Sequence, residues 1–287
     1  MVIGIDLGTT NSLVSYYTDD GPKIIPNRLG DRLTPSIVSV DDDDQIYVGK
    51  TASERMLLYP NTCASVFKRD MGTDRKFELN GHSFTAEELS SFVLRSLKED
   101  AEVFLGEEVT EAVISVPAYF NDKRRKATKR AGELAGLKVD RIISEPTAAA
   151  IAYGLYNTDG KSKFLVFDLG GGTFDVSILD YFDPILEVRA VAGDNFLGGE
   201  DFTNVIENLF FEKNPELKRS TLSDKELNAV RNACEKIKLG FNDAISSSAS
   251  VTSTLFSKNS VISASICPKS SLPCSDTLLL ISSTRFK

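Results

Sequence analysis

DLGGGTFD, residues Asp168–Asp175, decides the fold of this chain, together with a shorter relative near its start, DLGTTN at Asp6–Asn11. Each turn follows an apolar run of β-forming residues, VIGI at 2–5 and FLVF at 164–167. Glycines let backbone N–H groups approach phosphate oxygens, threonine hydroxyls donate further hydrogen bonds, and aspartates hold a hydrated magnesium ion. The pair therefore predicts one nucleoside triphosphate site with a turn on either side.

The residues after the second turn exclude two common nucleotide-binding motifs. Val176-Ser177-Ile178-Leu179 alternates apolar and polar residues, which predicts a strand that closes a β-hairpin. The P-loop and the Rossmann fingerprint both need a helix at that place. The alternative is that both turns are ordinary glycine hairpins that bind no ligand. This alternative is weaker because the same pattern occurs twice.

Composition and charge limit the classes of function. The 287 residues are 41% hydrophobic and 26% charged, which is typical of a soluble globular protein of about two domains. The sequence shows no secretory leader pattern and no long apolar stretch, so we expect a cytoplasmic protein that contacts no membrane. The net charge of −8 argues against nucleic-acid binding, and we expect the basic cluster at 123–130 to form a solvated helix face.

Cysteine and histidine usage gives little support for a zinc site or a histidine-based catalytic pair. No two cysteines form a C-x-x-C pair, and His82 is the one histidine. The four cysteines are Cys63, Cys234, Cys267 and Cys274.

The first hundred residues predict a β-meander followed by an inserted smaller lobe. Apolar runs at 13–17 and 23–26 flank a turn at 20–22, which indicates antiparallel strands. Residues 34–108 predict the smaller lobe, with short strands near 36–40 and 46–48 and a helix at 86–104. The apolar residues of that helix recur at helical spacing and are expected to face the core: Leu89, Phe92, Val93, Leu97, Ala101 and Phe104.

Two strand–helix pairs follow. Residues 112–116 predict a buried strand that ends at Pro117, and a helix from Asp122 to Ala135 follows it. Residues 141–144 predict the next strand, and EPTAAAIAYG at 145–154 predicts a helix with proline in its first turn and glycine at its end. The alanines leave room for a sheet on either side, which suits a helix that crosses between two lobes.

These motifs resemble those of the 70-kilodalton heat-shock chaperone family and, more broadly, those of the actin and sugar-kinase ATPase fold. The resembling stretches are 3–12, 116–122, 145–154, 167–176 and 193–202, and the resemblance covers residues 1 to about 242. Within the family, residues 67–72 and 89–102 most resemble the bacterial HscC-type chaperones.

The resemblance implies an α/β chain with the actin-like ATPase fold, in which two ribonuclease H-like lobes are duplicated. A complete first lobe would span 1–160, with the smaller subdomain at 34–108, and a partial second lobe would span 161–245. Residues 246–287 depart from the family as a tail with 14 serines, four basic residues and one acidic residue. We therefore expect a truncated chain that lacks the β-rich peptide-binding domain and its helical lid.

The resemblance also implies ATP hydrolysis by in-line attack of water, in the service of protein folding and the stress response. Such a step needs positioning and charge neutralisation more than covalent chemistry, and the residue types present suit it. ATP or ADP would bind with Mg²⁺ and with K⁺ as a companion cation. The implied catalytic residues are Lys68, Glu145, Asp168 and Thr173. The implied nucleotide-binding residues are Gly8, Thr9, Thr10, Asn11, Gly170, Gly171, Gly172, Thr173, Gly198, Gly199, Glu235 and Lys238. The carboxylates implied to hold the metal, mostly through water, are Asp6, Glu145, Asp168 and Asp175.

Several roles rest on the resemblance alone. Lys68 would orient the attacking water, whereas by itself it would be interpreted as a surface lysine in a basic pair. Glu235 and Lys238 would hold the adenine. Pro117 and Arg125 would relay the nucleotide state to the lobe surface, although a strand terminator and an exposed cation are their simpler interpretations.

The family further implies partners, and two alternative functions stay open. The implied partners are a J-domain co-chaperone and a nucleotide exchange factor, while direct capture of peptide clients is not expected from a chain without the peptide-binding domain. One alternative is a nucleotide-independent remnant or interaction module, since truncation within a lobe would weaken the positioning on which hydrolysis depends. The other is a sugar-kinase-type phosphotransferase of the same fold, against which the family-specific stretches at 116–122 and 193–202 argue.

Overall fold

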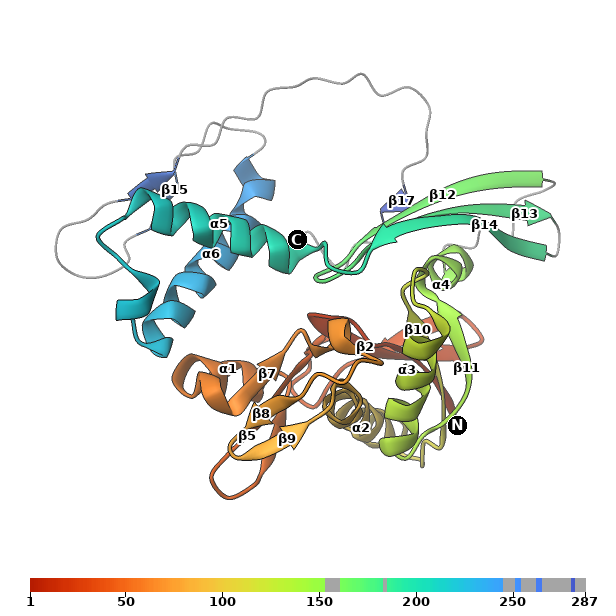
Figure 1. Ribbon diagram of the computed structural model, residues 1–287. Coiled ribbons are helices and arrows are strands. Elements are labelled where there is room, and N and C mark those ends of the chain that lie inside the picture. Colours follow the sequence, from red (N-terminus) through yellow and green to blue (C-terminus); the bar gives the residue numbers. More distant parts are fainter. Residues whose placement is uncertain (153–160, 183–184, 245–250, 254–261, 265–279, 282–287) are drawn as a thin grey trace.

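A mixed β-sheet in the first half of the chain carries the first glycine turn. The computed structural model describes residues 1–152, 161–182, 185–244, 251–253, 262–264 and 280–281 (Figure 1). In it the sheet has the order β11-β10-β1-β2-β3. β1 pairs antiparallel with β2 and parallel with β10, so the expected meander is extended by parallel strands. The strands are β1 (Val2–Asp6), β2 (Asn11–Thr18), β3 (Gly21–Ile25), β10 (Glu111–Val116) and β11 (Lys138–Ser144), with β4 (Thr34–Pro35) against the start of β2.

The two faces of this sheet differ because strand side chains alternate. On β1, Ile3 and Ile5 are buried in the hydrophobic core, whereas Gly4 and Asp6 line a cleft on the opposite face. β10 repeats the pattern, with Ile114 in the core and Ser115 at the cleft. The sheet thus separates a packed core from a cleft that carries Asp6 and Ser115.

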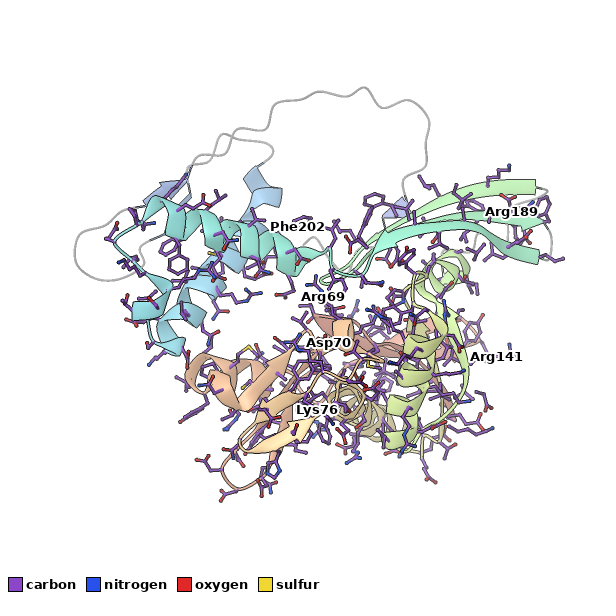
Figure 2. The ribbon with its side chains drawn as sticks, viewed as in Figure 1. Arg69, Asp70, Lys76, Arg141, Arg189 and Phe202 are labelled. Carbon is purple, nitrogen blue, oxygen red and sulfur yellow. The ribbon has the colours of Figure 1, made fainter. Side chains whose placement is uncertain are left out.

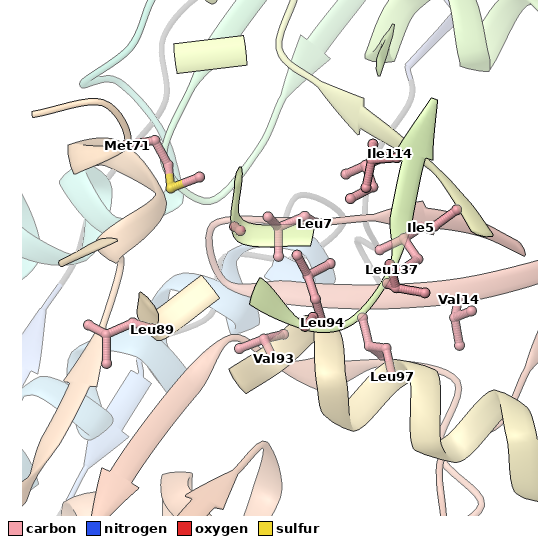
Figure 3. Packing of buried hydrophobic residues seen from close by; sticks show 14 of the residues in the cluster. Ile5, Leu7, Val14, Met71, Leu89, Val93, Leu94, Leu97, Ile114 and Leu137 are labelled. Atoms are coloured by element: carbon pink, nitrogen blue, oxygen red, sulfur yellow. The ribbon is translucent and has the colours of Figure 1, made fainter. Parts of the chain in front are cut away.

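Helices α2 (Ala86–Leu105) and α3 (Asp122–Leu134) cover the core face. Apolar residues of α2 pack with those of the strands, as Figure 3 shows for Leu89, Val93, Leu94 and Leu97. Burial of such a side chain contributes about 1.5–3 kcal/mol relative to exposure. The expectation of a core-facing Phe104 is wrong, since its side chain lies at the end of the helix, 49% exposed and edge-on to Tyr16.

Between the meander and α2 lie short strands and one α-helix, within the range 34–108 for which a smaller lobe was predicted; that division stays a prediction. A three-stranded antiparallel sheet of order β6-β5-β7 packs against helix α1 (Lys50–Leu58), and a separate hairpin pairs β8 with β9. The strands are β5 (Ile37–Val40), β6 (Ile46–Val48), β7 (Cys63–Ser65), β8 (Phe77–Leu79) and β9 (His82–Phe84); two 3₁₀ helices, η1 (Pro60–Thr62) and η2 (Phe67–Asp70), flank β7.

A second sheet of order β14-β13-β12-β17 carries the second glycine turn. β12 (Lys161–Leu169) and β13 (Phe174–Phe182) form the predicted hairpin, and β14 (Ile185–Asp194) continues it antiparallel. Helix α4 (Glu145–Ala152) contacts β10 and β11 of the first sheet and β12 of the second, as its alanines predicted.

A short part of the serine-rich tail is paired with the second sheet. β17 (Leu280–Ile281) lies parallel to β12, with Val166 opposite Leu280 and Phe167 opposite Ile281. A sheet edge offers backbone groups to any extended segment, and no local pattern in a serine-rich tail predicts this pairing.

Two helices follow the second sheet. α5 (Gly199–Lys213) and α6 (Asp224–Ala244) pack together, with the short η4 (Arg219–Thr221) between them, and a hairpin pairs β15 (Val251–Ser253) with β16 (Ile262–Ala264). Gly154, expected to end α4, and most of the tail lie outside the described residues. Among the helices that the structure describes, none is long and apolar enough to cross a membrane.

Candidate nucleotide-binding site

The turn after β1 is held in shape by two serines. The Gly8 N–H donates to Ser12 Oγ at 3.1 Å, and Ser36 Oγ donates to the Gly8 carbonyl at 2.8 Å. A Cβ atom at Gly8 would lie 1.9 Å from the Asn11 carbonyl oxygen, so only glycine fits. The turn therefore presents Thr9, Thr10 and Asn11 to the cleft on a fixed backbone.

The turn after β12 is fixed by its carbonyl groups. The Gly170 carbonyl accepts from the Gly199 N–H at 3.0 Å, and the Gly171 carbonyl accepts from the Glu200 N–H at 2.8 Å. Within the turn, the Gly170 N–H donates to the Thr173 carbonyl at 2.9 Å. The start of α5 thus anchors the turn from outside the cleft.

The two turns contact each other directly. A Cβ atom at Gly171 would lie 1.9 Å from Thr10 Oγ1, and one at Gly172 would lie 2.4 Å from Thr9 Cγ2. These glycines are therefore required by the close approach of the other turn, and not only by phosphate chemistry. The expectation that both turns wall one site agrees with this placement.

Lys68 and Glu145 form a buried ion pair between η2 and α4. Their Nζ and Oε1 atoms are 2.9 Å apart, and the Lys68 side chain is only 5% exposed. The ammonium also lies 5.7 Å from the centre of the Phe120 ring. In the structure Lys68 is therefore not the surface lysine that its basic neighbour suggests.

Carboxylates crowd the cleft and raise one another's pKa. Burial, opposed in part by Lys68, raises the pKa of Glu145 to about 8, with Asp6 and Asp168 adding to the rise. Burial together with Asp6 and Asp175 raises the pKa of Asp168 to about 6. Negative charge is thus concentrated where little solvent screens it, which is the arrangement a bound cation relieves.

We predict that stabilisation by Mg-ATP grows as the pH rises from 6 to 8.5. Because the folded-state pKa values of Glu145 and Asp168 are raised, the folded protein holds extra protons in this range. These groups therefore lower the stability of the free protein as the pH rises toward 8, while a cation meets fewer competing protons. The measurement is the melting-temperature shift on adding Mg-ATP at each pH.

Glu145→Gln is the matched control for this profile. The phosphates of the nucleotide titrate in the same way in both experiments. Any difference in how steeply the melting-temperature shift rises with pH is therefore due to the Glu145 carboxylate. A flatter profile in Glu145→Gln is expected, and parallel profiles in the two proteins would contradict the assignment.

Asp175 faces Asp168 across the hairpin but is more deeply buried. The two residues are register partners in β12 and β13, and Asp175 is 2% exposed. Its Oδ1 accepts from the Tyr119 N–H at 3.0 Å, and burial, opposed by this bond, raises its pKa. The bond ties the second hairpin to the segment after β10.

A cleft of about 1050 Å³ gathers most of the predicted site. This volume is at the upper end for small-molecule sites. The predicted residues that line it are Asp6, Gly8, Thr9, Thr10, Asn11, Lys68, Glu145, Asp168, Gly170, Gly171 and Thr173. Gly172 and Asp175 lie beside this cleft, and Gly198, Gly199, Glu235 and Lys238 form a separate group.

That separate group joins α6 to the start of α5. Lys238 Nζ donates to the Gly199 carbonyl at 2.9 Å and to Thr203 Oγ1 at 3.0 Å, and it pairs with Glu235 at 2.6 Å. Thr203 Oγ1 donates in turn to Glu235 Oε2 at 2.6 Å. The polar atoms of Glu235 and Lys238 are thus engaged with α5, one layer behind the glycine turn.

Arg125 holds the segment that follows Pro117. Its Nε donates to the Phe120 carbonyl at 3.0 Å, and the Phe120 N–H donates to the Pro117 carbonyl at 3.1 Å. Arg125 is therefore not a fully exposed cation, and its contacts lie next to Tyr119, whose N–H reaches Asp175. The proposed relay of the nucleotide state stays a prediction.

The oxygen ligands in the cleft suit a hydrated Mg²⁺ ion. Mg²⁺ prefers oxygen, keeps several waters and is commonly held by one or two carboxylates plus phosphate. Asp6, Glu145 and Asp168 supply such oxygens, and Ser115 Oγ orients Asp6 by donating to its Oδ1 at 2.9 Å. Among the described residues, no three potential ligands gather closely enough to hold a metal ion by themselves.

Several supporting residues were missed in the sequence. Ser115 could have been found, because it is the polar residue that alternation places at the cleft end of β10, beside Asp6. Ser12 belonged to the resembling stretch 3–12 but was given no role, and Ser36 gave no signal, since its partner Gly8 lies 28 positions away. Arg69 belonged to the resembling stretch 67–72 but was given no role, yet it contacts the second glycine turn.

One comparison with known proteins bears on the site. The family model described as Hsp70 protein matches residues 2–79 and 74–266 of this chain. The two matched ranges together contain both glycine turns, η2, α4, α5 and α6, and so include every residue of the predicted site.

Proposed function

This chain belongs to the Hsp70 family, and from that premise we propose that its cleft binds ATP with Mg²⁺ and hydrolyses the terminal phosphate. Membership implies an actin-like ATPase fold, nucleotide binding and the co-chaperones typical of the family. The observation that carries the proposal is the meeting of two glycine–threonine turns beside a buried lysine in a cleft of nucleotide size.

The side chains divide into three tasks. Thr9, Thr10 and Thr173, with the backbone of both turns, would bind the phosphates, because such N–H and hydroxyl donors match phosphate oxygens. Asp6, Glu145 and Asp168 would hold Mg²⁺ through its water shell. When bound, that ion neutralises the charge that develops on the phosphate oxygens.

Lys68 would orient the attacking water. Its Nζ is paired with Glu145, and the residue lines the cleft. The segment that carries it, η2, is anchored to the second turn through Arg69. A hydrogen-bond donor fixed in this way needs little rearrangement during the reaction, which is the basis of electrostatic catalysis. Phosphoryl transfer to water depends on this kind of positioning.

The strand order supports a duplicated fold. β10-β1-β2-β3 in the first sheet matches β17-β12-β13-β14 in the second, and β10 and β17 are each parallel to their neighbours. We propose on this ground that the two sheets are the centres of two related lobes. A J-domain protein and a nucleotide exchange factor are the proposed partners, and the HscC-type assignment stays a prediction.

Single-turnover hydrolysis of ATP by the purified chain tests this function. We expect release of inorganic phosphate that requires Mg²⁺ and needs no sugar acceptor. Phosphate appearing only on an added sugar would favour the sugar-kinase alternative. Neither binding nor hydrolysis would favour the nucleotide-independent module.

A further inference from the structure

Arg69 joins η2, in the first half of the chain, to the second glycine turn. Its Nε donates to the Gly172 carbonyl at 2.8 Å, and its Nη1 donates to Asp201 Oδ1 at 3.1 Å. Nη2 contacts the other oxygen of Asp201, so the guanidinium binds that carboxylate with two parallel bonds. Figure 2 shows Arg69 below the start of α5.

The contact completes the anchoring of the turn. The Gly170 and Gly171 carbonyls already accept from N–H groups at the start of α5, and Arg69 supplies the donor for the third carbonyl, that of Gly172. In a trans peptide the N–H points away from the C=O. Fixing the Gly172 carbonyl therefore also fixes the direction of the Thr173 N–H, on the side away from Arg69.

The same residue is fixed to Lys68 through the backbone. Lys68 and Arg69 are consecutive in η2, a four-residue 3₁₀ helix with Phe67 fully buried on its inner side. Val66, which precedes η2, has φ of 61°, a left-handed conformation that a β-branched residue rarely adopts. Such strain persists only where surrounding contacts enforce it, which indicates that the orientation of η2 is imposed.

We propose that Arg69 is a positioning residue that couples the second glycine turn to Lys68, so that the turn and Lys68 are held in a fixed position relative to each other at the phosphates. The proposal rests on the hydrolysis proposed above. Loss of Arg69 frees the Gly172 carbonyl and separates η2 from α5, while the first turn, Asp6 and the bonds from α5 to the Gly170 and Gly171 carbonyls stay in place. Nucleotide binding is therefore retained and the chemical step is slowed.

A second cation from the first half of the chain lies on the same side. Arg124, at the start of α3, has its guanidinium 5.1 Å from the centre of the Phe120 ring and 5.9 Å from that of Phe196, which lies just before α5. Gly72, two residues after η2, adopts φ of 73° and lies close to the backbone of Arg124. Arg124 thus adds a second contact between the first half of the chain and the segment before α5.

The test measures Mg-ATP affinity and the single-turnover hydrolysis rate separately. For Arg69→Ala we expect a rate lower by about ten- to a hundredfold, as small misplacements of reacting groups produce, with an affinity within about threefold of the unmodified protein. Arg69→Lys keeps the charge near Asp201 but not the two parallel bonds. Its hydrolysis rate should therefore lie between that of the unmodified protein and that of Arg69→Ala. Arg75→Ala is the matched control, because Arg75 is an exposed arginine that pairs with Asp70 in the same segment.

Asp201→Asn tests the contact from the other side, and keeps the proposal testable if Arg69→Ala does not fold. Asp201→Asn should also lower the hydrolysis rate. Adding Arg69→Ala to it should lower the rate little further, because the two residues act as one unit. An unchanged rate in Arg69→Ala or Asp201→Asn would overturn the proposal while leaving ATP hydrolysis standing. No hydrolysis by the unmodified chain would overturn the proposed function itself, and this inference with it.

Discussion

Lys68→Ala is expected to lower the rate of ATP hydrolysis by at least about a hundredfold while Mg-ATP still binds. Removal of one fixed donor at a reacting centre typically costs about 10²–10³ in rate. Lys68 is held by its ion pair with Glu145, whereas the hydrogen bonds that fix the two glycine turns come from other described residues. The measurements are single-turnover hydrolysis and equilibrium binding of Mg-ATP.

The substitution also leaves Glu145 without its cation, and this effect needs its own control. A buried carboxylate that loses its partner destabilises the fold, and its pKa rises further above about 8. Lys68→Ala combined with Glu145→Gln removes both charges, and its comparison with Glu145→Gln alone isolates the loss of Lys68. Lys76→Ala, a change of an exposed lysine in the same segment, should hydrolyse ATP normally. Normal hydrolysis by the double variant would remove Lys68 from the mechanism.

Gly198→Ala is expected to weaken Mg-ATP binding by about ten- to a hundredfold, equivalent to about 1.4–2.7 kcal/mol. The backbone at Gly198 is extended, with φ of 179°, so alanine meets no backbone strain there. Its Cβ atom, however, would lie 2.6 Å from backbone atoms of Gly171 and Gly172. Since those atoms cannot rotate away, the start of α5 must separate from the turn and release its carbonyl groups, at a cost of about 1–3 kcal/mol.

Gly240→Ala is the matched control for Gly198→Ala. Gly240 lies within α6 and has no neighbour within 4 Å of an added Cβ atom. Alanine is favoured over glycine inside a helix by about 0.8–1 kcal/mol, so this variant should be at least as stable as the original chain. Equal Mg-ATP affinity in the two variants would show that the contact between the turn and α5 does not shape the site.

The sequence predicted the parts of the fold that local patterns determine. The hairpin between β12 and β13 followed from alternation after a glycine turn, and the contacts of α4 with both sheets followed from its alanines. The positions of Asp6 and Asp168 at strand ends followed in the same way. In each case the physical cause lies within about ten residues of the feature.

Other features depend on contacts between distant segments, which no local pattern reveals. Arg69, Gly172 and Asp201 meet only because three elements converge, and Ser36 reaches Gly8 across 28 positions. The pairing of β17 with β12 arises in the same manner. Phe104 fits the helical spacing of the core yet is half exposed, while the next residue, Leu105, packs against the core.

Thermal unfolding with and without Mg-ATP, for the unmodified chain and for Asp168→Asn, tests the central claim most directly. A ligand that binds the folded state raises its stability, by about 2.7 kcal/mol at a hundredfold excess over Kd. We predict a clear upward shift of the melting temperature that needs Mg²⁺ and that Asp168→Asn abolishes. An unchanged melting temperature at saturating Mg-ATP, or an equal shift in Asp168→Asn, would contradict the assignment of this cleft as the nucleotide site.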